Sequence, residues 1–470
     1  MSHLEAAVPE LDSLLPSRAN GQLRASLRPA VRTEVPGPRS RVLLDRQGLR
    51  ESAARSYPRR LPIAVARAAG SFIEDADGNV FVDFLTGAGA LPLGHSDREI
   101  VAEVRRQLEI FVHGLDFPSP AKDLFTERQL SMLPAAMRDR TRLHFAGPTG
   151  ANAVDAAIKL CKTATGRESI VSFTGGFHGA TAAAMAVSGS VSQKAPVPAG
   201  LPGVHFMPYP YCLRCPLGLS PAGCGTSCAT LLERSLRDPL GGITRPAAVI
   251  VELVQGEGGV IPAPADFVKR LRDLTRELEI PLIVDEVQTG CGRTGTWFAF
   301  EQYGIEPDVI VASKGLSGLG LPVALVLYDE RLDRWQPGAH TGTFRGNQLA
   351  FAGGAKMIEI FGRDHILANV LARGEQLMAG LRGLASSFPV IADVRGRGLM
   401  LGIELADPRT GEPSGEAARR VQQGCLRRGL ILEVGGRADS VVRLLPPLNV
   451  SAGVVTAALD VLTEAVSGDA

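Results

Sequence analysis

Apolar residues between about residues 140 and 330 follow two alternating patterns. Short, nearly continuous apolar runs, typical of buried strands, are separated by longer stretches in which apolar residues recur every three to four positions, as in amphipathic helices. The apolar runs are RLHFAG, SIVSF, AAVIVELV, PLIVDEV and DVIVASK, and the helical stretches include ANAVDAAIKLCKTATG and PADFVKRLRDLTRELE. This alternation predicts an α/β fold whose large domain is built on a doubly wound, mostly parallel sheet.

The flanking segments have different patterns. Upstream, apolar residues on both sides of the turn Asp77-Gly78-Asn79 predict a hairpin, and Asp97 is placed to cap the helix that follows. Downstream of residue 345, a long helical region leads to strand-like runs such as VVRLLPPLNV, which predict a smaller α+β domain. We predict a partly disordered extension at 1–55, a segment at 56–100 that packs with the small domain, a large domain at 101–360 and a small domain at 361–470.

Charge and cysteine content narrow the possible functions. The 470 residues include 50 basic and 49 acidic side chains, so neither a nucleic acid nor an anionic membrane surface is expected as a partner. No segment approaches the roughly 18 apolar residues of a membrane span. Acidic residues near the start (Glu5, Glu10 and Asp12), without a continuous apolar stretch, argue against a secretory signal. Seven cysteines, an odd number, favour a reducing compartment, and we predict a cytoplasmic protein.

The ends of the predicted strands carry the candidate chemistry. Asp285 ends one apolar run, and Lys314 follows another and precedes several glycines. Phe177 and His178 follow a third run, and a small-residue turn at 149–151 opens directly into a helix. Because ligands of parallel α/β sheets bind at the carboxyl ends of the strands, we expect these groups to converge at one edge of the sheet.

These groups together suit one cofactor. A helix N-terminus can hold a phosphate, and a lysine in a desolvated pocket can form a Schiff base with an aldehyde. An aspartate can keep a pyridine nitrogen protonated, and an aromatic ring can stack on the pyridine face. Each feature alone also has a structural explanation, since Asp285 could be a salt-bridge partner and Lys314 could reach the surface. Together they point to pyridoxal 5′-phosphate.

Several motifs strengthen this interpretation. They are PTGANAVDAAIKL, GGFHG, VELVQGEGGV, IVDEVQTGCGRTG, ASKGLSGLGLP, TGTFRGN, VRGRGLMLGIEL and VVRLLPPL, and Lys314 follows Gln288 after 26 residues. With these motifs the chain from about residue 60 to 465 resembles the class III (ω-amino acid) aminotransferases of the fold-type I pyridoxal-phosphate family. The resemblance implies a pyridoxal-phosphate-dependent transferase with a large sheet domain, a smaller α+β domain and a homodimer with shared active sites.

The resemblance also implies a role for each matching residue. Residues expected to hold or activate the cofactor are Lys314 (Schiff base and proton shuttle), Asp285 (pyridine nitrogen), Gln288 (3-hydroxyl), Phe177 and His178 (ring face), Gly150 and Ala151 (phosphate) and Thr343 (phosphate of the neighbouring subunit's cofactor). Many members of the family have Ser or Thr where this chain has Ala151, so one hydroxyl contact to the phosphate is expected to be missing. No metal ligand is expected among these residues.

Glu257 and Arg443 match the pair that manages two kinds of substrate in the family. The acid would neutralise Arg443 when an ω-amine binds, and Arg443 would take the α-carboxylate of glutamate or 2-oxoglutarate. A fixed ion pair in the small domain is the structural alternative.

Three stretches of the sequence point to a subgroup of the family. They resemble most the enzymes that convert L-2,4-diaminobutyrate and 2-oxoglutarate into L-aspartate 4-semialdehyde and L-glutamate, and they are FAGPTGANAVDAAIKL, TGGFHGATAAAMAVSG and MPYPYCLRCPLG. 4-Aminobutyrate or ornithine is the alternative donor.

Two hypotheses of other classes remain open. Cys212, Cys215, Cys224 and Cys228 are spaced as C-x2-C-x8-C-x3-C, which is compatible with a structural zinc or iron–sulfur site in a binding or assembly module. A metal-free surface loop whose cysteines can oxidise is the alternative. A non-catalytic scaffold descended from a transaminase is weakened by the presence of Lys314.

Overall fold

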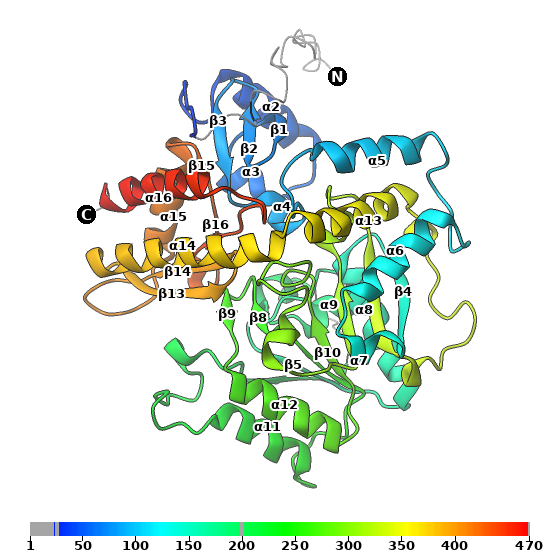
Figure 1. Cartoon of the computed structure of the whole chain (residues 1–470). Coiled ribbons are helices and arrows are strands. Elements are labelled where there is room, and N and C mark those ends of the chain that lie inside the picture. The colour runs from blue at the N-terminus through cyan, green and yellow to red at the C-terminus, as the bar shows by residue number, and fades with distance from the viewer. Residues whose placement is uncertain (1–22, 24–27, 198–201, 469–470) are drawn as a thin grey trace.

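The computed structural model of the chain describes residue 23, residues 28–197 and residues 202–468 (Figure 1). Part of the predicted extension, residues 1–22 and 24–27, lies outside the described residues. In the part of the chain that the structure describes, no helix is long and apolar enough to cross a membrane.

A seven-stranded sheet forms the centre of the large domain. Its order is β4-β12-β11-β10-β7-β5-β6, and every strand runs parallel to the others except β12, which is antiparallel to both neighbours. The bounds are β4 Thr141–Gly147, β5 Ile170–Phe173, β6 Val204–Met207, β7 Ala248–Val251, β10 Leu282–Asp285, β11 Val309–Ala312 and β12 Ala324–Asp329. The predicted α/β class with a mostly parallel sheet is confirmed, although β6 and β12 were not predicted.

Both faces of this sheet are buried. Successive residues of a strand point to opposite faces, so Val309 and Val311 of β11 pack in the cluster of α8 (Gly150–Thr165). Ile310 and Ala312 belong to the cluster on the other face, which includes residues of α12 (Ala265–Glu277) and α13 (Gln348–Arg363). The strand is therefore apolar throughout, and the polar residues that end it project from the carboxyl edge.

The remaining helices of the large domain cover the sheet and its ends. α13 packs against α5 (Arg98–Leu108), where Asp97 accepts hydrogen bonds from the N–H groups of Glu99 and Ile100 as the sequence predicted. The other elements of this region are α6 Pro120–Ser131, α7 Ala135–Arg138, α9 Ala182–Val187, α10 Val191–Lys194, α11 Ser227–Arg237, β8 Val254–Gln255, β9 Ile261–Pro262 and the 3₁₀ turns η2 Cys212–Arg214, η3 Ala299–Tyr303, η4 Lys314–Ser317, η5 Glu330–Leu332 and η6 Thr343–Arg345.

Besides the two-stranded pair β8-β9, the described residues contain two four-stranded sheets. The first has the antiparallel order β13-β14-β17-β16, and the second joins the N-terminal hairpin to a C-terminal strand in the order β1-β2-β3-β15, with Val82 of β3 opposite Leu430 of β15. The bounds are β1 Val65–Ala69, β2 Phe72–Asp75, β3 Val80–Asp83, β13 Ile391–Arg397, β14 Met400–Leu405, β15 Leu430–Ile431, β16 Glu433–Gly435, β17 Val441–Leu444, α3 Tyr57–Arg60, α4 Thr86–Gly89, α14 Ile366–Ser387, α15 Gly415–Arg427, α16 Ala452–Ser467 and η7 Arg437–Asp439. The exact domain boundaries remain a prediction.

The described part of the N-terminal extension is anchored to the hairpin. Asp77 accepts hydrogen bonds from the N–H groups of Arg39 and Ser40 at the start of α2 (Pro38–Arg50), at 2.7 and 2.9 Å. The side-chain oxygen of Asn79 accepts from Arg32 and Thr33. Two polar residues of the hairpin turn therefore hold this segment on the surface.

A buried ion pair at the start of β11 is expected to stabilise the large domain. Asp308 accepts from Arg272 at 2.6 and 3.2 Å and from the N–H of Leu282 at 2.9 Å. Asp308→Ala leaves a buried guanidinium unpaired and should lower the free energy of unfolding by about 3–5 kcal/mol, measured by urea denaturation. Glu330→Ala, which removes an exposed pair with Arg142, is the control and should cost less than about 1 kcal/mol. Equal losses in the two variants would contradict this assignment.

Candidate active site

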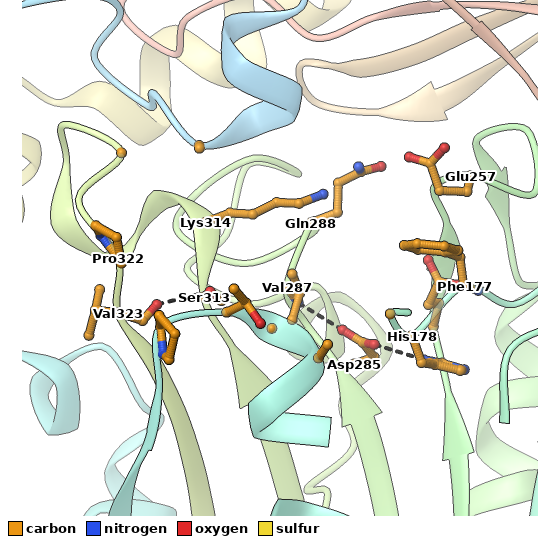
Figure 2. A pocket seen from close by; sticks show the side chains of 18 of the residues that line it. Phe177, His178, Glu257, Asp285, Val287, Gln288, Ser313, Lys314, Pro322 and Val323 are labelled. Carbon is orange, nitrogen blue, oxygen red and sulfur yellow. Dashed lines mark hydrogen bonds and ion pairs between the residues drawn. The ribbon is translucent and has the colours of Figure 1, made fainter. Parts of the chain in front are cut away.

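The carboxyl ends of the central strands open into a cavity of about 380 Å³ (Figure 2). This volume is of the size that holds a small organic molecule. The predicted residues that line it are Gly150, Ala151, Phe177, His178, Glu257, Asp285, Gln288 and Lys314. The fold therefore gathers at one edge groups that lie up to 164 residues apart in the sequence.

Lys314 lies two residues beyond β11 and its side chain extends across the cavity (Figure 2). Its backbone has φ of 44°, the left-handed conformation that is costly for a residue with a side chain and that recurs at functional sites. Burial lowers the pKa of its ammonium below the ordinary value, and the carboxylate of Glu257 only partly opposes this effect. The lysine is thus more readily available as a neutral amine than a surface lysine.

Asp285 ends β10 and is almost fully buried. Its Oδ2 lies 2.7 Å from Nδ1 of His178, and its Oδ1 accepts from the N–H of Val287 at 3.0 Å. Burial opposes the charged form of His178, but the hydrogen bond and charge of Asp285 outweigh it, so the pKa of His178 is raised. The sequence prediction placed His178 over the cofactor ring; its contact with Asp285 favours a position that orients this carboxylate instead.

Glu252 is a site residue that the sequence analysis missed. It follows β7 directly, and its two oxygens accept from the N–H groups of Phe177 at 2.8 Å and Gly256 at 2.9 Å. Burial raises its pKa to about 7. Glu252 therefore joins the loop of Phe177 to the loop of Glu257. The available signal was an acid at the end of a continuous apolar run, the same signal that identified Asp285.

The opposite wall of the cavity is the N-terminus of α8. Thr149 caps this helix in a capping box with Asn152, and the first N–H groups of the helix, those of Gly150 and Ala151, have no intrahelical acceptor. A Cβ at Gly150 would lie 2.9 Å from the methyl groups of Val287, so the close approach of the two segments requires glycine. The helix end offers a positive dipole and free donors to an anion.

Arg443, on β17, is 1% exposed and pairs with Glu257, which lines this cavity. Its Nη1 and Nη2 donate to the two oxygens of Glu257 at 2.6 and 2.9 Å, so the predicted pair is present in bidentate form. Burial disfavours both charges, but the mutual attraction outweighs it, raising the pKa of Arg443 and lowering that of Glu257. A second carboxylate, Glu433, lies 2.8 Å from Nη2 and was not predicted.

A second cavity of about 600 Å³ adjoins the first. Both cavities are lined by Phe177, Glu257 and Lys314, and the outer one is also lined by Tyr57, Arg60, Gln422, Glu433, Arg437 and Asp439. The small domain and the N-terminal segment thus supply much of the outer wall. Glu257, which pairs with Arg443, and Lys314 thus lie where the two cavities meet.

Two predicted features lie outside these cavities. Thr343 is exposed, and its carbonyl oxygen lies 2.7 Å from Nε2 of His113. Cys212, Cys215, Cys224 and Cys228 are free thiols around a separate cavity of about 20 Å³. Among the described residues, no group of three His, Cys, Asp or Glu side chains is placed to hold a metal ion.

The residues present fit pyridoxal phosphate. The cavity joins a helix N-terminus suited to a phosphate, a buried carboxylate, an aromatic ring and a lysine with a lowered pKa. The buried side-chain oxygen of Gln288 has no hydrogen-bond partner within the described chain and remains available to a ligand hydroxyl. With the mixed, seven-stranded sheet, this site defines a fold-type I pyridoxal-phosphate-dependent transferase.

Comparisons with known proteins agree with this assignment. The profile of the class-III aminotransferases matches residues 53–466, and the chain belongs to this family. The diaminobutyrate–2-oxoglutarate aminotransferase of Rhizobium meliloti (strain 1021) is 51% identical over 417 residues, covering 87% of this chain and 88% of that protein. The enzyme of the same name from Haemophilus influenzae is 45% identical over 417 residues, covering 87% and 91%.

Solved structures show the same architecture. An amine transaminase from an uncultivated Pseudomonas species in its pyridoxal-phosphate-bound form is 27% identical, with a TM-score of 0.81 over 89% of this chain and 97% of that one. An (S)-enantioselective ω-transaminase from Thermomicrobium roseum is 25% identical, with a TM-score of 0.82 over 93% and 99%. The predicted family, enzyme class and cofactor, pyridoxal 5′-phosphate, are thereby confirmed.

Glu252→Gln tests the anchoring of the two loops. The amide keeps one acceptor oxygen but turns an NH₂ group towards the other backbone N–H, so we expect a dissociation constant for pyridoxal phosphate about 10- to 100-fold higher. Glu301→Gln is the matched control, because Glu301 also accepts from a backbone N–H, that of Phe298 at 2.8 Å, away from both cavities. Titration of each apoenzyme with the cofactor measures the dissociation constants of the two variants. Unchanged affinity in Glu252→Gln would show that the anchor is dispensable.

Proposed function

We propose that this enzyme transfers the 4-amino group of L-2,4-diaminobutyrate to 2-oxoglutarate, reversibly, giving L-aspartate 4-semialdehyde and L-glutamate. The observation that carries the proposal is the bidentate Glu257–Arg443 pair beside Lys314, which suits an enzyme that must accept an ω-amine and an α-amino acid in turn. The similarity to two diaminobutyrate–2-oxoglutarate aminotransferases, 45% and 51% identical over most of the chain, supports the choice of diaminobutyrate.

The site residues divide the work of holding the cofactor. Lys314 would bind it covalently through Nζ, Asp285 would face its ring nitrogen, Gln288 its 3-hydroxyl and Phe177 its ring. The N–H groups of Gly150 and Ala151 would hold its phosphate. When bound, pyridoxal phosphate supplies an aldehyde that captures the amine and a ring that withdraws electrons from the adjacent carbon. His178 would keep Asp285 oriented through the 2.7 Å contact between Nδ1 and Oδ2.

Lys314 moves the proton of the reaction. Its Nζ would take the proton from the substrate carbon that bears the transferred amine and pass it to the cofactor carbon that receives the amine, and it would move the proton the opposite way in the reverse direction. A general base works best with a pKa near the working pH, and burial lowers the pKa of Lys314 in that direction.

Glu257 and Arg443 adapt the site to two substrates. In the arrangement observed, Glu257 neutralises Arg443, so this guanidinium is not available to an α-carboxylate. Movement of Glu257 towards solvent, to which it is 37% exposed, would free the guanidinium for bidentate binding of the α-carboxylate of glutamate. The arginine is fixed in its strand, so the carboxylate is the moving part.

We further propose a cytoplasmic homodimer with shared active sites. Near Thr343, the exposed apolar side chains of Phe111, Phe117 and Phe344 form a surface typical of an interface. Backbone hydrogen bonds of Gly114 and Gly346 hold the two segments together. Thr343 would reach the phosphate site of the partner subunit. The free state of all seven cysteines is in keeping with a reducing compartment.

A panel of amino donors tests the proposal. L-2,4-Diaminobutyrate, ornithine and 4-aminobutyrate are each supplied with 2-oxoglutarate, and the initial rate of glutamate formation is measured. The proposal expects the highest kcat/KM with diaminobutyrate. A higher value with 4-aminobutyrate or ornithine would replace it with the corresponding ω-amine.

Asp285→Asn tests the cofactor assignment. A neutral amide cannot stabilise a protonated ring nitrogen, so kcat should fall by about 10²–10³ or more while the cofactor stays bound. Steady-state rates and the visible absorbance of bound pyridoxal phosphate measure the two properties separately. A near-normal rate would rule out this role for Asp285.

Arg443→Ala should separate the two half-reactions. Loss of a charged, bidentate contact costs about 2–5 kcal/mol for the substrate that uses it, so the glutamate half-reaction should slow by about a hundredfold or more. Conversion by diaminobutyrate should change far less. Glu257→Ala should favour α-carboxylate substrates instead. Single-turnover absorbance with each donor measures these effects, and equal losses for both donors in Arg443→Ala would contradict the switch.

A further inference from the structure

The register of the sheet β13-β14-β17-β16 places Glu433 next to Arg443. In the antiparallel pairing of β16 with β17, Glu433 stands directly opposite Arg443, so the two side chains are cross-strand neighbours. Its Oε2 lies 2.8 Å from Nη2 as an ion pair, without the alignment of a hydrogen bond. Glu433 is therefore fixed in position but incompletely satisfied.

The other carboxylates of the two cavities each accept at least one hydrogen bond. Glu252 accepts from two backbone N–H groups, Asp285 contacts His178 and a backbone N–H, Glu257 accepts from Arg443 and Asp439 from Arg60. Among the described residues that line these cavities, Glu433 is thus the carboxylate that accepts no hydrogen bond.

Two carboxylates share one guanidinium at this point. Glu257 and Glu433 contribute two negative charges and Arg443 one positive charge, so the three side chains carry a net charge of −1. Burial raises the pKa of Glu433, and the nearby Glu257 adds to that effect against the attraction of Arg443. Because Arg60 and Arg437 line the same cavity, this excess is local to the three side chains, and an ammonium group placed against Glu433 would balance it.

We propose that Glu433 binds the 2-ammonium group of the diamino donor and thereby selects diamines over ω-amino acids that lack this group. The inference rests on the proposed function. Lys314 and Glu433 line the same cavity, so a donor whose terminal amine is at Lys314 extends along the wall that Glu433 forms. In the glutamate half-reaction Glu433 has no ammonium to bind and Arg443 serves the carboxylate.

Three donors isolate this contact. 4-Aminobutyrate is L-2,4-diaminobutyrate without its 2-amino group, and 1,3-diaminopropane is the same molecule without its carboxylate. All three present a terminal amine to Lys314. Only the two diamines carry the second ammonium. Loss of the Glu433 carboxylate that binds it should therefore lower kcat/KM with the diamines and not with 4-aminobutyrate.

The experiment compares the cofactor-loaded wild type with Glu433→Gln and Asp439→Asn, measuring kcat/KM of each donor with saturating 2-oxoglutarate. Glu433→Gln weakens a hydrogen bond to a charged group. Its kcat/KM should therefore fall about 10- to 100-fold with both diamines and change by less than about threefold with 4-aminobutyrate. Asp439→Asn, in the same cavity but held by arginines, should leave the ratios between donors unchanged.

A single-turnover measurement with L-glutamate separates recognition from support of Arg443. If Glu433 recognises the donor, Glu433→Gln should convert glutamate as fast as the wild type or faster, since a negative charge beside Arg443 is gone. Slower glutamate conversion, or equal losses with all three donors, would show that Glu433 only supports the arginine and would overturn the inference.

The two proposals can fail separately. A wild type that prefers 4-aminobutyrate to both diamines overturns the proposed function and this inference with it. A wild type that prefers the diamines, together with unchanged donor ratios in Glu433→Gln, overturns the inference alone.

Discussion

A buried guanidinium has to keep a carboxylate partner, and this constraint organises the active site around Arg443. Removing the partner of a buried charge costs several kcal/mol, so any device that frees Arg443 for a substrate must replace one carboxylate by another. Glu257 provides the removable carboxylate and the α-carboxylate of glutamate would provide its replacement. Glu433 also lies beside the arginine, and in our proposal it serves the 2-ammonium group of the diamino donor rather than the exchange itself.

The fold brings Glu257 and Arg443 to the reacting lysine from two different parts of the molecule. Lys314, Asp285 and Glu252 lie at the carboxyl edge of the large sheet, while Arg443 and Glu433 lie on neighbouring strands of a small sheet. The N-terminal hairpin shares a sheet with β15, close in sequence to β16, and so helps to place that small sheet. The site is thus formed between units whose relative position is held by backbone hydrogen bonds.

Much of this arrangement could be predicted from the sequence, for physical reasons. Continuous apolar runs predicted the buried strands, and polar residues directly after them, Asp285 and Lys314, predicted the site. The acid Glu252 gave the same signal and was overlooked. The contact between Glu433 and Arg443 could not be predicted, because it depends on the register of two short strands set by the turn at 436–440. The pairing of His178 with Asp285 also depends on tertiary packing.

The central claim is that the terminal amine of a diamino acid is moved to 2-oxoglutarate. It is tested most directly with L-2,4-diaminobutyrate labelled with ¹⁵N on the 4-amino group alone, incubated with the enzyme and 2-oxoglutarate. Mass spectrometry of the glutamate formed reports which amine was transferred. The account predicts that the glutamate carries the label. Unlabelled glutamate, which would mean transfer of the 2-amino group, or no glutamate at all, would contradict it.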